Sequence, residues 1–295
     1  MARPQYRYRK QPRRRIKFSS IMVALLLITA IAYPFWSAST LNVDERVVQI
    51  AGLHPNLKNM RIVFVSDIHE GIFFPQARVK NLISKINSLS PDIVIFGGDY
   101  AENSDGAVRF FKTAPQVHAR LGVFGVVGDR DRTEPESNFS LLVAEMTNYG
   151  CIPLTNNIAS VKVGQTYVHV IGADDYKNGT PDITAAAGQV SRDDFVIFAG
   201  HSPDLLTLAL DARSKENSNH WFDLALFGHT HGGQVTIFGR PVFPGFMPEI
   251  GAKYLSGWRE ENRAHVLVSN GVGTSIFPIR LFAAPQIHHI TLKAR

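Results

Sequence analysis

The chain contains the stretch Gly228-His229-Thr230-His231-Gly232-Gly233-Gln234, which directly follows the short apolar run 223–227. An apolar run of this length predicts a buried strand. Two histidines with one residue between them, in a glycine-rich turn at the end of a strand, can point two imidazoles at neighbouring positions. Such a pair suits a site for two metal ions. Alone it is weak evidence, because many histidines lie in cores with one hydrogen bond satisfied.

Four other apolar runs end in turns that contain aspartate or histidine: Asp67-Ile68-His69, Gly97-Gly98-Asp99, Gly128-Asp129-Arg130-Asp131 and Gly200-His201. The five turns together supply seven candidate metal ligands, namely Asp67, His69, Asp99, Asp129, His201, His229 and His231. Mixed carboxylate and imidazole ligands favour Mn²⁺, Fe or Zn²⁺ over Ca²⁺. Two such ions ~3.5–4 Å apart can clamp a phosphoryl group and activate a bridging water or hydroxide. One of the aspartates must then bridge the two ions.

Apolar runs and helical patterns alternate along the chain, which predicts an α/β fold with its site at the carboxyl ends of strands. Strands are predicted at 47–50, 61–66, 92–96, 122–127, 195–199, 223–227, 234–237, 265–269 and 287–292. Helices are predicted at 79–89, 107–119 and 139–149, and a further helix is predicted to start at Ser202-Pro203, with serine as its N-cap. Residues 152–171 predict short antiparallel strands around Gly164. We expect one globular domain over residues 43–295.

The N-terminal region has the pattern of a membrane anchor. Residues 1–17 hold eight basic side chains and no acidic one, and residues 18–43 contain no charged residue. As a helix, residues 18–36 would span ~28 Å, close to the thickness of a bilayer's hydrocarbon core. The positive-inside rule then predicts a basic cytoplasmic tail over residues 1–17, a transmembrane anchor over 18–36, and a main domain on the outer face of the cell membrane.

Two other interpretations of this region are a cleaved signal peptide and a buried core helix. A signal peptide could be cleaved near Ala32, after the small residues Ala30-Ile31-Ala32, which would release a secreted protein. Arg13-Arg14-Arg15 also resembles part of a twin-arginine signal, although the residues that follow fit poorly. A buried core helix is disfavoured by the charge-free length and the basic flank.

Outside the tail, the charge of the chain is nearly balanced. The remaining residues carry 23 basic and 25 acidic side chains, so the main domain shows no charge pattern that predicts nucleic-acid binding. Cys151 is the only cysteine, which excludes an intrachain disulfide. Asp174-Asp175 is most simply interpreted as part of a solvated loop.

The five ordered motifs resemble those of the calcineurin-like metallophosphoesterases, over essentially the whole main domain. The Gly-His-x-His-Gly-Gly-Gln turn, together with Ser269-Asn270-Gly271-Val272-Gly273 and Pro278-Ile279-Arg280, is most similar to the membrane-anchored, YkuE-like branch. The resemblance implies two facing β-sheets flanked by helices, in four layers α/β/β/α. It also implies that one metal takes Asp67, His69, Asp99 and His231, and that the other takes Asp99, Asp129, His201 and His229, with Asp99 bridging.

The third motif departs from the family pattern, which has Gly-Asn-His where this chain has Gly128-Asp129-Arg130. Aspartate can ligate through oxygen as asparagine does, and it adds a negative charge. Arginine cannot act as a general acid near neutral pH, but it can stabilise phosphoryl oxygens as a bidentate donor. We expect a metal-dependent phosphoesterase in which Asp99, Arg130 and His201 act in catalysis. The change at Arg130 predicts either a slower enzyme or one that favours substrates with good leaving groups, such as pyrophosphates.

Three apolar segments occur near the predicted site, at residues 72–75, 238–247 and 276–282. If they are exposed they would form a rim that faces a membrane or holds acyl chains, which motivates a phospholipid-like or lipid-linked diphosphate substrate. Equally, they could pack as a lid over the domain's own core. Two other functional classes stay open: a metal-binding or sensor protein that has lost turnover, and an interaction module of the cell envelope.

Overall fold

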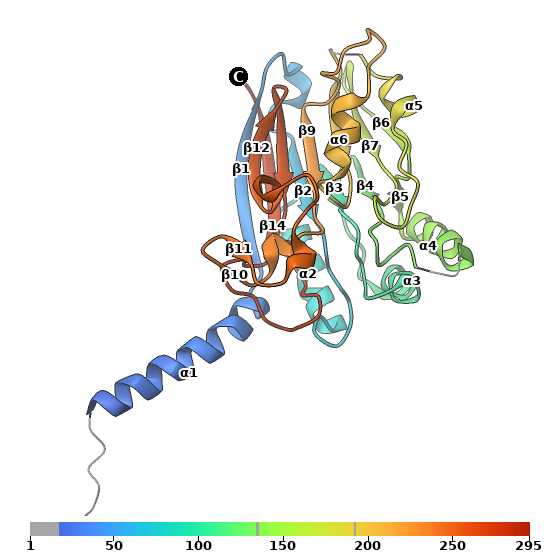
Figure 1. Cartoon of the computed structure of the whole chain (residues 1–295). Coiled ribbons are helices and arrows are strands. Elements are labelled where there is room, and N and C mark those ends of the chain that lie inside the picture. The colour runs from blue at the N-terminus through green and yellow to red at the C-terminus, as the bar shows by residue number, and fades with distance from the viewer. Residues whose placement is uncertain (1–17, 134–135, 192) are drawn as a thin grey trace, which may run out of the picture.

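The computed structural model describes residues 18–133, 136–191 and 193–295, and the predicted basic tail over residues 1–17 lies outside them. Two six-stranded sheets face each other (Figure 1). The first has the order β1 (Asn42–Ile50), β14 (Gln286–Ala294), β2 (Arg61–Val65), β3 (Ile93–Phe96), β4 (Gly122–Gly125) and β5 (Cys151–Pro153). The second has the order β12 (Gly257–Glu261), β13 (Ala264–Val268), β9 (Leu224–Phe227), β8 (Phe195–Ala199), β7 (Thr166–Gly172) and β6 (Asn157–Val163). A small hairpin pairs β10 (Thr236–Ile237) with β11 (Arg240–Pro241).

The central strands are continuously apolar because both of their faces are buried. In β2, Ile62 and Phe64 point into the core between the two sheets, whereas Val63 and Val65 pack against helices. In β8, Ile197 similarly faces the other sheet while its neighbours on either side face outward. Burial on both faces removes the apolar–polar alternation that would mark a half-exposed strand.

Helices cover the outer face of each sheet. The first sheet is covered by α2 (Gln76–Ser88), α3 (Ser104–Thr113) and α4 (Glu136–Tyr149), and the second by α5 (Thr184–Ala187) and α6 (Leu205–Asp211). Short 3₁₀ turns lie in the connections: η1 (Pro55–Leu57), η2 (His231–Gly233), η3 (Pro244–Phe246) and η4 (Ala252–Tyr254). The four-layer α/β/β/α architecture expected from the sequence is confirmed.

Several predicted boundaries were wrong, for local reasons. Helix α3 ends at Thr113 and does not reach residue 119, because Pro115 disfavours the helical conformation at Ala114, which is extended. Helix α6 begins at Leu205, because the Ser202 hydroxyl donates to the Asp204 carboxylate and accepts from the Asp204 amide, which closes a turn ahead of the helix. The polar strand β12 was not predicted. The antiparallel pair around Gly164 is present as β6 and β7.

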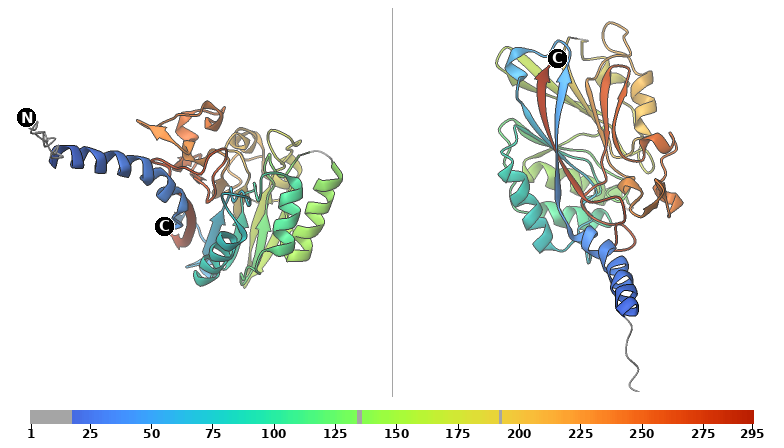
Figure 2. Two further views of the ribbon diagram at one scale, coloured as in Figure 1. Left: turned by 90° about the horizontal axis from the view of Figure 1, so that it is seen from below. Right: turned by 90° about the vertical axis from the view of Figure 1, so that its left-hand side faces the viewer.

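The apolar N-terminal segment forms helix α1 (Phe18–Ser39), three residues longer than predicted, with Pro34 inside it. It projects away from the domain (Figures 1 and 2), and no part of its apolar 18-residue window is buried in the protein. Only Ser37 and Ala38, at its C-terminal end, are buried. By length and composition the helix can cross a membrane.

Candidate metal centre

The seven predicted ligands come together at one edge of the two sheets. Backbone hydrogen bonds fasten the turns to one another: the Asp67 amide donates to the Gly98 carbonyl (2.9 Å) and the His69 amide to the Asp99 carbonyl (3.0 Å). In the second sheet the Gly228 amide donates to the His201 carbonyl (2.8 Å). Because neighbouring parallel strands end at the same edge, the side chains that follow them converge.

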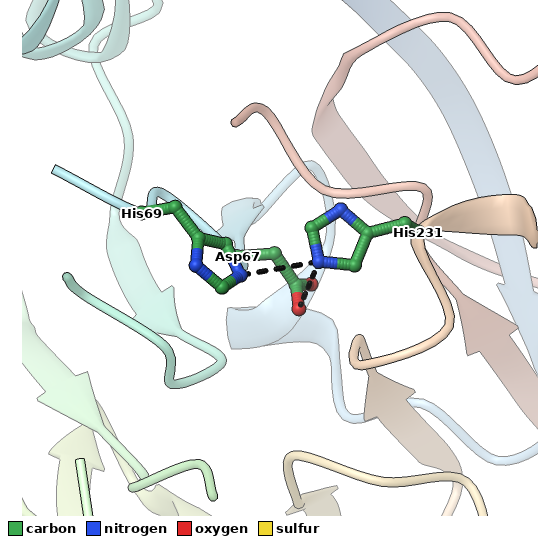
Figure 3. A group of neighbouring side chains, drawn as sticks. All are labelled: Asp67, His69 and His231. Atoms are coloured by element: carbon green, nitrogen blue, oxygen red, sulfur yellow. Dashed lines mark hydrogen bonds and ion pairs between the residues drawn. The ribbon is translucent and has the colours of Figure 1, made fainter. Parts of the chain in front are cut away.

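Asp67, His69 and His231 form the first cluster (Figure 3). The Nε2 atoms of the two histidines lie 3.1 Å apart, and Nε2 of His231 lies 3.5 Å from Oδ1 of Asp67. All three side chains are buried. Two imidazole nitrogens and a carboxylate oxygen that converge from buried side chains fit a divalent cation.

Asp129, His201 and His229 form the second cluster. Nδ1 of His229 lies 3.1 Å from Nε2 of His201 and 3.2 Å from Oδ1 of Asp129. Asp99 stands between the two clusters: its Oδ2 atom is 3.4 Å from Nε2 of His69 and 3.5 Å from Nε2 of His201. One carboxylate oxygen therefore faces both clusters.

Five of these seven residues adopt a left-handed backbone conformation, which non-glycine residues rarely take. The φ angles are 53° at Asp67, 50° at His69, 55° at Asp99, 69° at His229 and 51° at His231. Each such residue costs ~1–2 kcal/mol relative to a right-handed conformation. Strain of this kind concentrates at functional sites, where the surrounding structure holds it.

Glycines allow the ligand turns to approach one another closely. A Cβ atom at Gly128 would overlap Oδ1 of Asp99, and one at Gly228 would overlap Oδ2 of Asp67. A Cβ atom at Gly273 would overlap the backbone carbonyl of Ile68. These glycines are therefore required by the closeness of neighbouring turns.

The charges in the clusters are coupled. Burial by itself would lower the pKa of His201, but the carboxylates of Asp99, Asp129 and Asp67 outweigh it and raise that pKa well above the usual value. Burial, followed by the charge of His69, lowers the pKa of His231. His201 thus favours the cationic state and His231 the neutral state. A bound metal ion would require the neutral form of each ring that it coordinates.

Asp131 holds the loop that carries Asp99. Its carboxylate accepts hydrogen bonds from the amides of Asp99 (2.7 Å), Tyr100 (3.1 Å) and Gly128 (2.9 Å). Burial, and then the charge of Asp99, raise the pKa of Asp131 to about 8. The sequence showed Asp131 within a motif but gave it no role.

Arg130 lines a cavity of about 260 Å³ that residues of both clusters also line. Its amide donates to Oδ1 of Asp99 (3.0 Å), and its side chain is exposed. Phe243, Phe246 and Ile276 form an apolar wall of the same cavity. The Phe246 ring packs 5.3 Å from the ring of His231, measured between centroids.

The loop after β7 brings a second cation to this cavity. Nζ of Lys177 lies 3.5 Å from Oδ2 of Asp129, and Asn178 donates to the Asp129 carbonyl (2.9 Å). The Asp175 carboxylate holds this loop by accepting hydrogen bonds from the backbone amides of Lys177 and Asn178 (3.0 and 2.6 Å).

The neighbouring Asp174 pairs with Arg132 through two hydrogen bonds of 3.1 and 2.7 Å. The expectation of a solvated Asp174-Asp175 loop was wrong, because both carboxylates are buried and bonded.

Arg280 is a fully buried guanidinium behind His231. It donates to four carbonyl groups, those of Gly273, His231, Ala283 and Asn270, and its Nη2 lies 3.3 Å from Nδ1 of His231. Among the described residues no carboxylate forms an ion pair with it. Burial lowers the pKa of Arg280 to about 9, so it remains charged at neutral pH.

Comparison with known proteins agrees with this geometry. Residues 60–233 match the sequence model described as calcineurin-like phosphoesterase. The chain belongs to this family. The phosphoesterase is 26% identical over 257 residues to the uncharacterized metallophosphoesterase YkuE of Bacillus subtilis, an alignment that covers 85% of each chain. It is 25% identical over 249 residues to phosphodiesterase YaeI of Escherichia coli, with 83% of this chain and 86% of that protein covered.

A zebrafish relative, transmembrane protein with metallophosphoesterase domain, is 26% identical over 293 residues. That alignment covers 92% of the phosphoesterase and 62% of the zebrafish protein. The expected family and the expected class of enzyme, a phosphoester hydrolase, are therefore confirmed. Named transmembrane relatives and the apolar helix α1 also indicate an association with membranes.

Proposed function

We propose that the phosphoesterase hydrolyses phosphoesters at a centre of two divalent ions. One ion would be held by Asp67, His69, Asp99 and His231, and the other by Asp99, Asp129, His201 and His229. The observation that carries this proposal is the position of Asp99 Oδ2, within 3.5 Å of a histidine nitrogen in each cluster. Bound divalent ions supply Lewis acidity and lower the pKa of a bound water, so hydrolysis needs no side-chain nucleophile.

The protein's own contribution is to hold these ligands in place before substrate arrives. Asp131 fixes the Asp99 loop through three amides, and Arg280 fixes the backbone of His231. Both act from buried positions, where hydrogen bonds are little disturbed by water. Two of the left-handed residues, Asp99 and His231, are held directly by these contacts.

Arg130 and Lys177 would bind the phosphoryl oxygens. Both side chains border the cavity, and both carry a positive charge where negative charge develops during phosphoryl transfer. Arg130 cannot donate a proton to the leaving group near neutral pH. The proposed enzyme therefore favours esters whose leaving group departs without a proton, such as diphosphates or aryl esters.

The substrate we propose carries an apolar portion, as a phospholipid or a lipid-linked diphosphate does. Phe243, Phe246 and Ile276 border the cavity beside the candidate metal ligands. These apolar side chains cannot bind a phosphate group, so they suit an apolar part of the substrate. An acyl or isoprenoid chain laid on this wall would be shielded from water. A water-soluble nucleotide hydrolysed more efficiently than any lipid headgroup ester would contradict this part of the proposal.

The test uses the full chain in detergent, loaded with Mn²⁺ and assayed with a chromogenic phosphodiester. Asp99→Asn keeps the shape of the side chain but removes the charge that two cations would share. We expect this variant to lose hydrolysis and to bind fewer ions, whereas Asp211→Asn, an exposed aspartate at the end of α6, behaves as the wild type. Unchanged hydrolysis in Asp99→Asn would refute the proposed centre.

Arg130 supports a second candidate function, a metal-binding or sensor protein without turnover. An arginine at the position of the expected histidine removes the proton donor that the family pattern provides. Two bound ions per chain, no hydrolysis of any phosphoester, and no gain of hydrolysis in Arg130→His would select this candidate over the enzyme.

A further inference from the structure

Helix α1 joins the domain without a flexible linker. Only Thr40 and Leu41 separate α1 from β1. The Arg280 amide donates to the Pro34 carbonyl (2.9 Å), and Nη2 of Arg78 donates to the Ala38 carbonyl (2.8 Å). The C-terminal end of α1 is thus bonded to two separate parts of the domain. If α1 crosses a bilayer, these bonds determine which face of the domain lies against that bilayer.

Exposed apolar side chains lie in the loops close to the residues that bond the end of α1. We name six of them the apolar rim: Ile72, Phe73, Phe238, Ile276, Phe277 and Phe282. Ile72 is 93% exposed, Phe282 is 77% exposed and Phe238 is completely exposed. Such side chains gathered on one surface commonly mark an interaction site.

Hydrogen bonds connect the rim to α1 step by step. Arg78, which holds Ala38 of α1, also donates to the Phe73 carbonyl (2.9 Å). The Thr236 amide donates to the Leu281 carbonyl (3.0 Å), which places the β10–β11 hairpin beside the loop that follows Arg280. Figures 1 and 2 show this hairpin at the end of the domain from which α1 projects.

We propose that the apolar rim inserts into the interfacial layer of the bilayer that α1 crosses. A bilayer is the occupant that the structure favours, because the rim continues from an unburied apolar helix long enough to span one. Ile276 belongs both to the rim and to the wall of the cavity, so the cavity opens next to the lipid surface. This proposal does not depend on catalysis.

The depth of a rim residue distinguishes docking from simple tethering, since α1 alone would keep the protein on a vesicle. The full chain is reconstituted into vesicles of phosphatidylcholine and phosphatidylglycerol with a nitroxide on Phe238→Cys. Cys151 is buried, and burial raises the pKa of its thiol well above the usual range, so it stays unlabelled. Tyr167→Cys on β7 is the matched control, because Tyr167 is exposed and lies at the start of its strand, away from the metal clusters.

We expect the label at position 238 to collide more often with oxygen, which dissolves in lipid, than with an aqueous nickel chelate. The label at position 167 should show the reverse. A second pair of variants, Phe238→Asp and Phe282→Asp, combined with a label on Ile72→Cys, should lift position 72 into water while the protein stays on the vesicle. Aqueous behaviour of the label at position 238 in the otherwise unchanged protein would overturn the proposal.

Discussion

Replacing Arg130 separates transition-state stabilisation from structural support. The Arg130 side chain is exposed and forms no hydrogen bond or ion pair with another described residue. The hydrogen bond that its backbone amide donates to Asp99 is retained in every substitution except proline. Truncation to alanine should therefore change the free energy of unfolding by less than ~0.5 kcal/mol. Loss of one charged donor at a phosphoryl group should lower kcat by about 10²–10³, or ~2.7–4 kcal/mol of activation free energy.

The assay compares two phosphodiesters under saturating Mn²⁺, one with an aryl leaving group and one with an alkyl leaving group. Arg130→Ala should slow both esters, because it removes a donor to the phosphoryl oxygens. Arg130→His should then accelerate the alkyl ester relative to Arg130→Ala, by up to ~10²–10⁴, since a protonated imidazole can supply the proton that an alkoxide needs. This gain should disappear as the pH rises above the pKa of the imidazole.

Arg263→Ala serves as the control, because Arg263 is an exposed arginine in the β12–β13 turn, away from the clusters. Rates in Arg130→Ala that equal those of Arg263→Ala, with both ions bound, would refute the role of Arg130. A gain in Arg130→His that is equal for aryl and alkyl esters would refute the argument about the missing proton donor.

Three further predictions concern stability. Metal loading should raise Tm and chelation should lower it, because coordination offsets the strain of the left-handed turns and the repulsion between buried carboxylates. Ions at 100 times Kd should add about 2.7 kcal/mol to the free energy of unfolding. Thermal unfolding with and without a chelator measures this difference. Arg280→Met should cost at least ~3 kcal/mol in denaturant unfolding, because four buried carbonyls lose their donor. Burial raises the pKa of Asp223 to about 6; its ionised form therefore weakens folding as pH rises from about 4 to 6, by up to ~3 kcal/mol. Asp223→Asn should raise Tm at pH ~8 and lose that advantage towards pH ~4; equal gains at both would contradict this assignment.

The layered fold could be predicted because burial on both faces leaves a simple mark in the sequence. Continuous apolar runs such as 195–199 and 223–227 are strands with almost the predicted bounds. Strand β12 was not predicted because it is an edge strand that pairs only with β13 and is only partly buried. Its sequence, Gly-Trp-Arg-Glu-Glu, therefore contains few apolar residues. The start of α6 was misplaced because the same serine can cap a helix or close a turn, and the carboxylate of Asp204 decides between them.

The seven residues of the candidate metal centre could be named from the sequence because each follows a strand that ends at the shared edge. Their assignment to two ions still rests on the resemblance and stays a prediction. Lys177 and Arg280 could not be given roles, because their partners lie far away in the sequence. Lys177 lies 48 positions after Asp129, and Arg280 lies 49 positions after His231. The left-handed backbone of the ligand turns could not be predicted, because the identity of a histidine or an aspartate does not reveal its φ angle.

The contacts that hold α1 bear on whether the N-terminal region is a retained anchor or a cleaved signal peptide. Pro34 and Ala38, which accept hydrogen bonds from Arg280 and Arg78, both lie after the candidate cleavage position at Ala32. Cleavage there would leave the docked end of α1 on the domain, and the apolar rim would remain exposed with most of the apolar helix gone. A freely soluble product would then present Phe238 and Phe282 to water without cover. If the rim lies against a lipid surface, as proposed, a retained anchor is the interpretation that agrees with it.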